Sequence, residues 1–415
     1  MNANAANDDR GIGPAGSRPG LRIFLIAGEE SGDRLGAALM AAIETLASDP
    51  VQFSGVGGSA MTERGLHSLF PLDDIAYNGF SAIPAQLPLI LRRIREAADA
   101  VIAASPDLLV IIDSPDFTHR VARRVRAAAP HIPIVDYVSP TVWAWRPGRA
   151  AAMRRYVDHV LALLPFEPEA HRRLGGPPCT FVGHPLSEAV ATLRPHPAEA
   201  GRRAAAPPLL LVLPGSRGGE ISRHLATFGA AVGLAVERLG EAEIVLPTVP
   251  HLADRLRRET AAWPVAPRIV VDPEQKWGAF RQARAALAAS GTVTLELALA
   301  QVPTVLAYKV TLVEELIARA LIKAKMVGLA NIILGEMIMP ELLQRDATPR
   351  NLADALVAIV GDTPQRRRQT EAFLRLDAVM EIGGRSPSAR AAVAALALCR
   401  RSPPYRPAGR HANHA

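Results

Sequence analysis

The sequence predicts an α/β fold of two Rossmann-like domains that face a central cleft. The chain has 415 residues, which is enough for two domains. Short apolar runs alternate with longer helical stretches, as in a parallel sheet covered by helices. Each half also opens with the same succession of strand, glycine-containing loop and helix.

In the first half, the run LRIFLIA at Leu21–Ala27 predicts a buried strand, followed by a glycine loop and a helix from Asp33 to Ala47. Further strands are expected at Val51–Val56, Leu108–Asp113, Ile132–Val138 and His159–Leu164. The segment Arg194–Pro208 is rich in Pro, Ala and Arg and is expected to be the boundary between the domains.

The second half restarts with a strand at Leu209–Leu213, a glycine loop at Pro214–Glu220 and a helix at Ile221–Leu239. Further strands are expected at Glu243–Leu246, Arg268–Val271, Ala285–Ala288 and Thr304–Lys309. We therefore expect domains at 21–200 and 207–385, a C-terminal helix at 386–400, and disordered tails at 1–20 and 401–415.

Composition excludes several classes of protein. The formal charge of +7 comes from 43 arginines and only four lysines, and the arginines are scattered without an aromatic and basic recognition pattern, which argues against a nucleic-acid binder. No signal peptide and no apolar run of about 18 residues is visible, so no membrane span is expected. The two cysteines fit a reducing cytoplasm, and no cluster with metal-ligand spacing appears, so we expect no metal and no cofactor.

One uncharged segment, Ile75–Leu91, is followed at once by Arg92, Arg93 and Arg95. An uncharged apolar stretch beside arginines is typical of an element that lies on a membrane surface. An ordinary buried loop and helix is an equal reading of the same composition.

The first glycine loop, Gly28–Asp33 (GEESGD), follows a strand and begins a helix. It differs from GxGxxG, and Glu29 and Glu30 would repel a pyrophosphate, so it does not indicate a dinucleotide site. Two readings stay open: a structural turn in which Ser31 or Asp33 caps the helix, or a loop that borders the cleft and orders an acceptor.

Two aspartates follow the apolar run of the third expected strand. Asp113 stands at its carboxyl end, where the ligands of open α/β sheets bind. Partial burial there raises the pKa of a carboxyl group, which suits a general base that takes a proton from a hydroxyl group. We assign the chemistry to Asp113 and the cap of the next helix to Asp116, and the sequence leaves the choice of base between them open.

The segment Tyr137–Arg146 (YVSPTVWAWR) follows a strand with two tryptophans and an arginine. Trp145 and Arg146 are candidates for the acceptor side, because aromatic rings beside a cation can line a sugar or acyl site. Hydrophobic packing is at least an equal reading for Trp143. His184, in the segment FVGHP, is expected to be structural.

The segment LPGSRGGE at Leu213–Glu220, in the second half, indicates a phosphate site more strongly than the first glycine loop does. Backbone amides, Ser216 and Arg217 converge there between a strand and a helix, and the guanidinium fork of arginine matches a diphosphate.

A second helix start carries Ser290, Gly291 and Thr292, and Glu296 lies about one turn farther on, where a carboxylate can reach ribose hydroxyl groups. The chain lacks GxxxxGK[ST]. The two loops together predict a nucleoside diphosphate bound without a Walker lysine, whose charge arginine and helix dipoles neutralise.

Seven segments resemble, in order and spacing, the lipid-A-disaccharide synthase family: GEESGD, IIDSPDF, YVSPTVWAWR, LLPFEPE, FVGHP, LPGSRGGE and SGTVTLE. The resemblance spans roughly Leu21–Arg400. It implies a bacterial glycosyltransferase with the GT-B fold that acts in the lipopolysaccharide pathway at the inner face of the inner membrane. The implied donor is UDP-2,3-diacylglucosamine and the implied acceptor is 2,3-diacylglucosamine 1-phosphate (lipid X). The products would be the β-1′,6-linked disaccharide 1-phosphate and UDP, formed with inversion, which needs a base but no covalent nucleophile.

The resemblance also implies roles for single residues. Asp113 matches the first aspartate of the family's IDAPDF motif and is the general-base candidate, and Arg217 matches the arginine proposed to hold the donor phosphates. Ser31 matches the serine of the family's GEASGD loop. Asn331 matches an asparagine near the nucleotide, and Glu296 matches the glutamate of the helix that SGT begins.

The sequence departs from the family pattern at two places. Glu30 replaces an alanine and adds a charge on the acceptor side, and Asn331 lacks the proline that precedes it in the family's LPNL segment. Because both implied substrates are lipids, the membrane reading is favoured for about residues 75–95. The stretch Leu312–Leu334 is expected to be an inter-domain helix pair, with assistance in docking as the other reading.

Three rival functions are weighed against this one. A peptidoglycan glucosaminyltransferase or a UDP-GlcNAc epimerase would share the nucleotide half but should lack VSPTVWAWR. A non-catalytic sugar-nucleotide binding protein would have no use for an acid at position 113. The sequence leaves the oligomeric state open.

Overall fold

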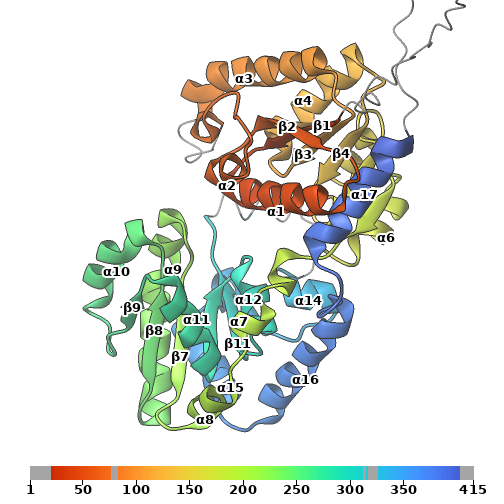
Figure 1. The fold of residues 1–415 in the computed structure, drawn as a ribbon. Helices are drawn as coiled ribbons and strands as arrows, with labels where there is room; N and C mark the ends of the chain where they lie inside the picture. Colours follow the sequence, from red (N-terminus) through yellow and green to blue (C-terminus); the bar gives the residue numbers. More distant parts are fainter. Residues whose placement is uncertain (1–19, 76–82, 312–314, 316–325, 402–415) are drawn as a thin grey trace, which may run out of the picture. The chain divides into compact units, whose positions relative to one another are not determined.

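The structure is a computed structural model that describes residues 20–75, 83–311, 315 and 326–401. It contains two six-stranded sheets with parallel strand pairs, each covered by helices (Figure 1). The chain divides into two compact units, residues 1–137 with 392–415 and residues 138–391. The expected α/β class with two open sheets is therefore confirmed.

The first sheet has the order β2-β1-β3-β4-β5-β6. Its strands are β1 (Leu21–Ala27), β2 (Val51–Val56), β3 (Leu108–Ile112), β4 (Ile134–Tyr137), β5 (His159–Ala162) and β6 (Cys179–Phe181). The strand order reverses between β1 and β3. In open α/β sheets, ligands bind beyond the carboxyl ends of the strands at such a reversal.

The helices α1 and α2 lie on one face of strands β1–β4, and α3 and α4 lie on the other (Figure 1). The helices along this part of the chain are α1 (Glu30–Leu46), α2 (Ser59–Glu63), α3 (Ile83–Ala104), α4 (Pro115–Ala128), α5 (Gly148–Met153), α6 (Glu167–Arg173) and α7 (Val190–Leu193). The last five of the seven residues of β1 are buried, as expected for a strand that helices cover on both faces.

The second sheet has the order β12-β11-β10-β7-β8-β9, so its strand order reverses between β7 and β10. Its strands are β7 (Leu209–Leu213), β8 (Glu243–Pro247), β9 (Arg268–Val270), β10 (Ala285–Ala289), β11 (Thr304–Tyr308) and β12 (Glu341–Leu343). Its helices are α8 (Pro197–Ala204), α9 (Gly218–Leu239), α10 (Ala253–Thr260), α11 (Pro273–Gln282), α12 (Val293–Leu299), α14 (Leu329–Leu334), α15 (Pro349–Val360) and α16 (Pro364–Val379), and α17 (Pro387–Arg401) ends the described chain.

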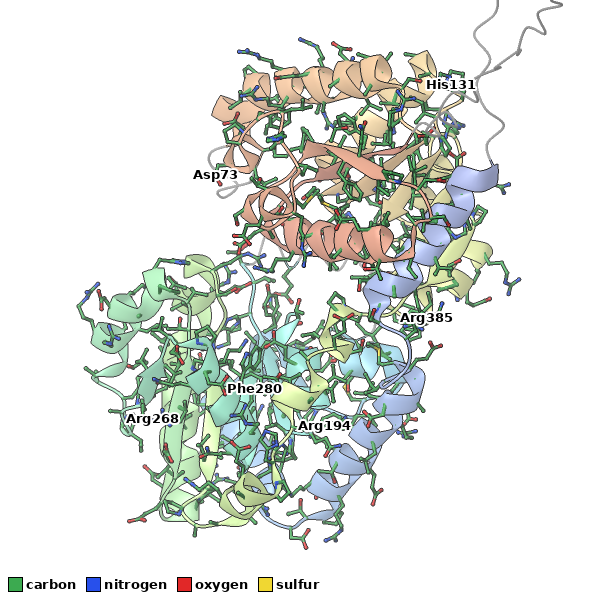
Figure 2. All side chains as sticks on the ribbon, viewed as in Figure 1. Asp73, His131, Arg194, Arg268, Phe280 and Arg385 are labelled. Carbon is green, nitrogen blue, oxygen red and sulfur yellow. The ribbon has the colours of Figure 1, made fainter. Side chains whose placement is uncertain are left out.

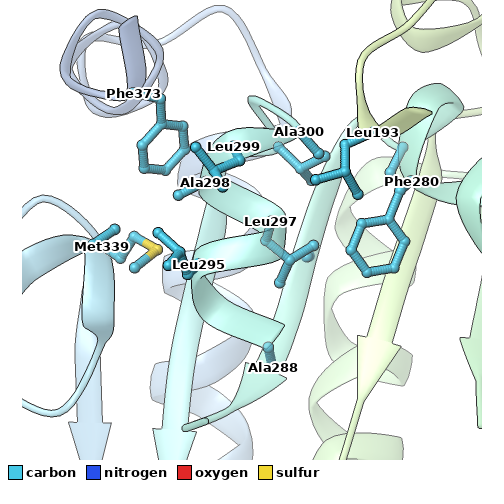
Figure 3. Packing of buried hydrophobic residues seen from close by; sticks show 14 of the residues in the cluster. Leu193, Phe280, Ala288, Leu295, Leu297, Ala298, Leu299, Ala300, Met339 and Phe373 are labelled. Carbon is cyan, nitrogen blue, oxygen red and sulfur yellow. The ribbon is translucent and has the colours of Figure 1, made fainter. Parts of the chain in front are cut away.

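Alternation along β7 divides the core of the second unit into two layers. Leu209, Leu211 and Leu213 point into one hydrophobic cluster, and Leu210 and Val212 point into another. In the first cluster, apolar side chains of α12 pack between the rings of Phe373 and Phe280 (Figure 3). The second cluster is formed with α9 and α15. Side chains fill the whole unit, with Phe280 in its interior and Arg268 at an exposed edge (Figure 2).

Most expected strands are observed within one or two residues of their predicted bounds, but α1 begins at Glu30 and α9 at Gly218, three residues before the predicted starts. The segment 194–208, which was expected to be the domain boundary, contains an unpredicted helix, α8. The guanidinium of Arg203 on α8 donates hydrogen bonds to Phe280 O at 2.9 Å and Ala300 O at 3.0 Å, at the carboxyl ends of two other helices. A helix that is attached through polar contacts of this kind shows no apolar periodicity in its sequence, so α8 could not be predicted from that pattern.

Several expectations fall outside the described residues: the tails 1–19 and 402–415, part of the segment 75–95 (residues 76–82), and residues 312–314 and 316–325 of the second apolar stretch. Among the helices that the structure describes, none is both long and apolar enough to cross a membrane.

Candidate functional site

Each sheet places sequence-predicted residues at its own reversal of strand order. Ser31, in the first turn of α1, and Asp113 follow β1 and β3, and Arg217 and Ser290 lie in the loops that follow β7 and β10. The carboxyl ends of neighbouring parallel strands lie at one edge of a sheet, so each pair of loops forms a candidate binding site of its own.

Asp113 has an unusual backbone conformation. Its φ is 53° and that of Ser114 is 44°, so two successive non-glycine residues lie in the left-handed region. The conformation is held by a hydrogen bond from Asp113 N to Tyr137 O at 3.1 Å and by one from the Thr118 hydroxyl to Asp113 O at 2.7 Å. Strain of this kind is maintained at functional sites, where the surrounding structure fixes a reactive group.

The electrostatic surroundings of Asp113 favour its protonated form. Burial, as the largest cause, together with the negative charge of Glu29 and a hydrogen bond to Glu29, raises the pKa of the Asp113 carboxyl group to about 6. The amide of Ser114, which donates to Asp113 Oδ1 at 2.7 Å, opposes this shift. A carboxyl group with a pKa near 6 is well matched to general-base chemistry near neutral pH.

The first glycine loop contacts the Asp113 loop directly. A Cβ atom at Gly28 would lie 2.1 Å from Cβ of Ser114, so only glycine permits this approach. Ser31 Oγ donates a hydrogen bond of 2.5 Å to Glu29 Oε1. Glu29 therefore interacts with both Ser31 and Asp113, a role that was not predicted from the sequence. The acceptor-side candidate Glu30 instead pairs with Arg34 at 2.6 Å on the exposed face of α1.

Neither Ser31 nor Asp33 caps α1, whose cap position is Glu29, and the cap assigned to Asp116 is wrong as well. Asp33 is buried and accepts hydrogen bonds from Gly58 N at 2.7 Å and Ala60 N at 2.9 Å, so it caps α2 rather than its own helix. The cap position of α4 is Ser114, and Asp116 lies exposed in the first turn. Within the described residues, Asp113 and not Asp116 is thus the partly buried carboxyl group beside Glu29.

A buried ionisable pair lies behind Asp113. His119 Nε2 is 3.1 Å from Asp136 Oδ2, and both side chains are almost completely buried. The charge of Asp136 contributes to the raised pKa of Asp113. Neither residue belongs to a motif that sequence reasoning could have identified.

A pocket of about 380 Å³ lies at the candidate site of the second sheet. It brings together six sequence-predicted residues: Ser216, Arg217, Ser290, Gly291, Thr292 and Glu296. It is also lined by Glu220, Thr248 and Lys276, which the sequence analysis did not assign. The Thr248 Oγ1 atom is buried and has no hydrogen-bond partner in the described part of the chain, so a ligand can supply one.

Glu220 changes the expected way of binding a phosphate. Its Oε2 atom accepts hydrogen bonds from Ser216 N at 3.2 Å and Arg217 N at 3.3 Å. A Cβ atom at Gly215, whose φ is 120°, would lie 2.5 Å from that oxygen. The loop amides that were expected to face a phosphate are therefore occupied by a capping carboxylate.

Arg217 remains available to an anion. Its side chain is 82% exposed, and it makes a 3.3 Å contact from Nη1 to Glu220 Oε1. Because an exposed guanidinium rotates easily, it can turn toward a diphosphate in the pocket.

Asn331 is not among the residues that line the pocket. It is completely buried, its Nδ2 donates to Glu341 Oε1 at 2.8 Å, and its Oδ1 accepts from Ile338 N and Met339 N at 2.9 Å. Glu341 also accepts from Gly328 N at 2.9 Å. Asn331 thus supports the loop beside Ser290 rather than presenting its own amide to a ligand.

The acceptor-side candidates Trp145 and Arg146 lie together, with the guanidinium 5.0 Å from the Trp145 ring, and neither lines the pocket. Trp143 packs edge-on against Phe166, which bears out the packing reading. His184 accepts a hydrogen bond from Leu186 N at 3.2 Å, and burial lowers its pKa to about 4, which fits the structural role expected for it.

A family model described as lipid-A-disaccharide synthetase matches residues 23–395. A lipid-A-disaccharide synthase from Nitrobacter hamburgensis is 62% identical over 371 residues, covering 89% of this chain and 94% of the relative. The chain belongs to the lipid-A-disaccharide synthase family. Another family member, from Rhodopseudomonas palustris, is 59% identical and covers 92% of this chain and 97% of its own length.

Solved structures of lower identity share the fold. A UDP-GlcNAc 2-epimerase from Neisseria meningitidis, bound to UDP-GlcNAc, matches with a TM-score of 0.60 and 10% identity, covering 91% of this chain and 100% of the other. The calicheamicin glycosyltransferase CalG4 matches with a TM-score of 0.56 and 17% identity, covering 93% and 100%. The fold is therefore GT-B, and as a lipid-A-disaccharide synthase family member the chain is a glycosyltransferase rather than an epimerase or a non-catalytic binding protein.

Proposed function

We propose that the chain transfers 2,3-diacylglucosamine from UDP-2,3-diacylglucosamine to lipid X. The products are the β-1′,6-linked lipid A disaccharide 1-phosphate and UDP. This substrate pair is the one that the family resemblance implies, and the family membership supports it.

In the proposed mechanism, Asp113 is the general base. Its carboxylate takes the proton of the acceptor's 6-hydroxyl group, the hydroxyl oxygen attacks the anomeric carbon, and the bond from that carbon to the UDP oxygen breaks with inversion. The single observation that supports this role best is that Asp113 is strained and partly buried. Its burial and the neighbouring Glu29 raise the pKa of its carboxyl group to about 6. Ser31 and Glu29 are proposed to hold that carboxyl group in place.

The pocket beside Arg217 is proposed to bind the UDP part of the donor. UDP-GlcNAc bound to the Neisseria epimerase supports a UDP-sugar in this fold. Arg217 would neutralise the diphosphate as the leaving-group charge develops, and Glu296 would bind the ribose hydroxyl groups.

We also propose that the protein docks on the inner face of the inner membrane through the described part of residues 75–95. Leu87 is 44% exposed there, and Arg92 and Arg95 are exposed on α3. Arg93 is unsuited to binding lipid headgroups, because it pairs with Asp74 at 2.5 Å and with Glu96 at 2.6 Å. An exposed leucine beside exposed arginines suits an anionic lipid surface.

Mass spectrometry of the products tests the proposed reaction. Purified protein with UDP-2,3-diacylglucosamine and lipid X should yield the disaccharide 1-phosphate and UDP. A parallel reaction with UDP-GlcNAc in place of the lipid donor should yield no disaccharide. Transfer from UDP-GlcNAc at an equal rate, or no lipid product with the diacylated donor, would overturn the assignment.

A further inference from the structure

Lys276 is an unassigned cation inside the nucleotide pocket. Its Nζ atom lies 2.9 Å from Glu296 Oε2 and 4.0 Å from the centre of the Trp277 ring. The Lys276 side chain is 28% exposed and that of Glu296 is 16% exposed, so this ion pair is better shielded than the surface pairs of the molecule.

The position of Lys276 is costly for a cation. It is the fourth residue of α11, where the positive end of the helix dipole disfavours a positive charge. Glu296 and the face of Trp277 compensate by binding the ammonium group from two directions. The chain also uses arginine for 43 of its 47 basic residues, so a compact ammonium group at this point departs from its general composition.

Contacts with Glu296 and Trp277 restrict the position of the Lys276 ammonium group, which in turn restricts the orientation of the Glu296 carboxylate. One carboxylate oxygen of Glu296 is bound by Lys276, which restricts rotation of the carboxylate and leaves its other oxygen for a hydrogen bond. Removing one member of a shielded ion pair leaves the other charge without compensation, so the orientation of Glu296 depends on Lys276.

We propose that Lys276 is a positioning residue for the nucleoside part of the donor. It holds Glu296 so that the free carboxylate oxygen accepts a hydrogen bond from a ribose hydroxyl group, and it does not bind the diphosphate. This inference rests on the proposed function, in which the pocket binds UDP.

Isothermal titration of the whole protein with UDP and with 2′,3′-dideoxy-UDP tests the proposal. Native protein should bind UDP about tenfold more tightly than the dideoxy analogue, as expected for loss of a hydrogen bond to a charged group. In Lys276→Met the UDP affinity should fall about five- to tenfold while the dideoxy-UDP affinity stays within about twofold. Arg375→Gln, which breaks the exposed pair with Glu336, is the matched control and should bind both ligands as native protein does.

A double-mutant cycle separates action through Glu296 from direct binding. If Lys276 acts through Glu296, then Lys276→Met adds no further loss of UDP affinity in the Glu296→Gln background. Equal losses for UDP and dideoxy-UDP in Lys276→Met would indicate a phosphate contact and overturn the proposal, as would no loss for either ligand or an additive cycle. Equal binding of both ligands by native protein overturns it as well, whereas no binding of UDP by native protein contradicts the proposed function itself.

Discussion

Glu220 Oε1 lies 3.3 Å from Nη1 of Arg217, while Oε2 of the same carboxylate accepts the backbone amide of Arg217 at 3.3 Å. The cap of α9 therefore occupies the loop amides, whereas the exposed guanidinium makes only a 3.3 Å contact with the same carboxylate. We therefore propose that the arginine side chain, rather than the backbone of its loop, binds the diphosphate.

Arg217→Ala should weaken UDP binding by about 2–4 kcal/mol and slow turnover, because a charged phosphate partner is removed. Isothermal titration with UDP measures the change. Arg238→Ala, which removes an exposed pair with Asp354, is the control and should bind UDP as native protein does. Unchanged UDP affinity in Arg217→Ala would remove that residue from the site.

Asn331→Ala should lower the free energy of unfolding by about 2–4 kcal/mol, because several buried hydrogen-bond partners lose their contacts at once. Chemical denaturation of the whole protein, followed by the fluorescence of the tryptophans, which lie in the second unit, measures this loss. Asn351→Ala, which removes an exposed hydrogen bond to Asp346 O, should cost under about 0.5 kcal/mol. Native stability together with a strong loss of UDP affinity in Asn331→Ala would instead indicate direct contact with the nucleotide.

The contrast between Asn331 and Arg217 shows how far the sequence can lead. Loops at the carboxyl ends of apolar strands were predictable, because strand periodicity and glycine positions place them there. Which side chain of a loop faces the ligand depends on tertiary partners that are far away in the chain. Asn331 is drawn inward by Glu341, and the Ser216 amide is occupied by Glu220.

The pair Glu29 and Glu30 makes the same point in one loop. Because the two side chains are identical, the sequence does not show which of them contacts Asp113, and Glu30 was the acceptor-side candidate, whereas the structure places Glu29 beside Asp113. Glu30 stands four residues before Arg34, a spacing that favours an exposed ion pair on a helix and could have identified Glu30 as the outward residue. The three-residue strand β12 and the helix α8 carried too little apolar periodicity to be predicted.

Asp113→Asn should be more stable than native protein above pH 6, by at most about 3 kcal/mol. The pKa of Asp113 is raised from 3.8 to about 6 in the folded state, chiefly by burial, so its ionisation opposes folding at neutral pH. The penalty is full above about pH 6 and disappears as the pH falls below 3.8, where the carboxyl group is protonated in both states.

Denaturation curves of native protein and Asp113→Asn from pH 4 to pH 8 test this sign. The gap in stability between the two proteins should narrow steadily as the pH falls through 6. A gap that stays constant with pH would mean that the carboxyl group titrates normally in the folded state.

Exchanging both exposed arginines of α3, in Arg92→Glu with Arg95→Glu, should reduce binding to vesicles that contain anionic lipid. Each lost basic residue weakens binding by about 1 kcal/mol, and the new acidic groups add repulsion. Co-sedimentation with phosphatidylglycerol vesicles at low salt measures the effect. The same exchange at Arg257 and Arg258, which are exposed on α10, should leave binding unchanged. Equal losses of vesicle binding in both double variants would mean that binding depends on net charge alone, and would contradict docking through α3.

Turnover and UDP affinity of Asp113→Asn, measured side by side, test the proposed base most directly. Asparagine keeps an oxygen for the Ser114 amide but cannot take a proton, so turnover of UDP-2,3-diacylglucosamine with lipid X should fall at least about a hundredfold while the dissociation constant of UDP changes less than about twofold. Turnover within about threefold of native, or a parallel loss of turnover and UDP binding, would contradict the account, because Asp113 would then be dispensable or merely structural.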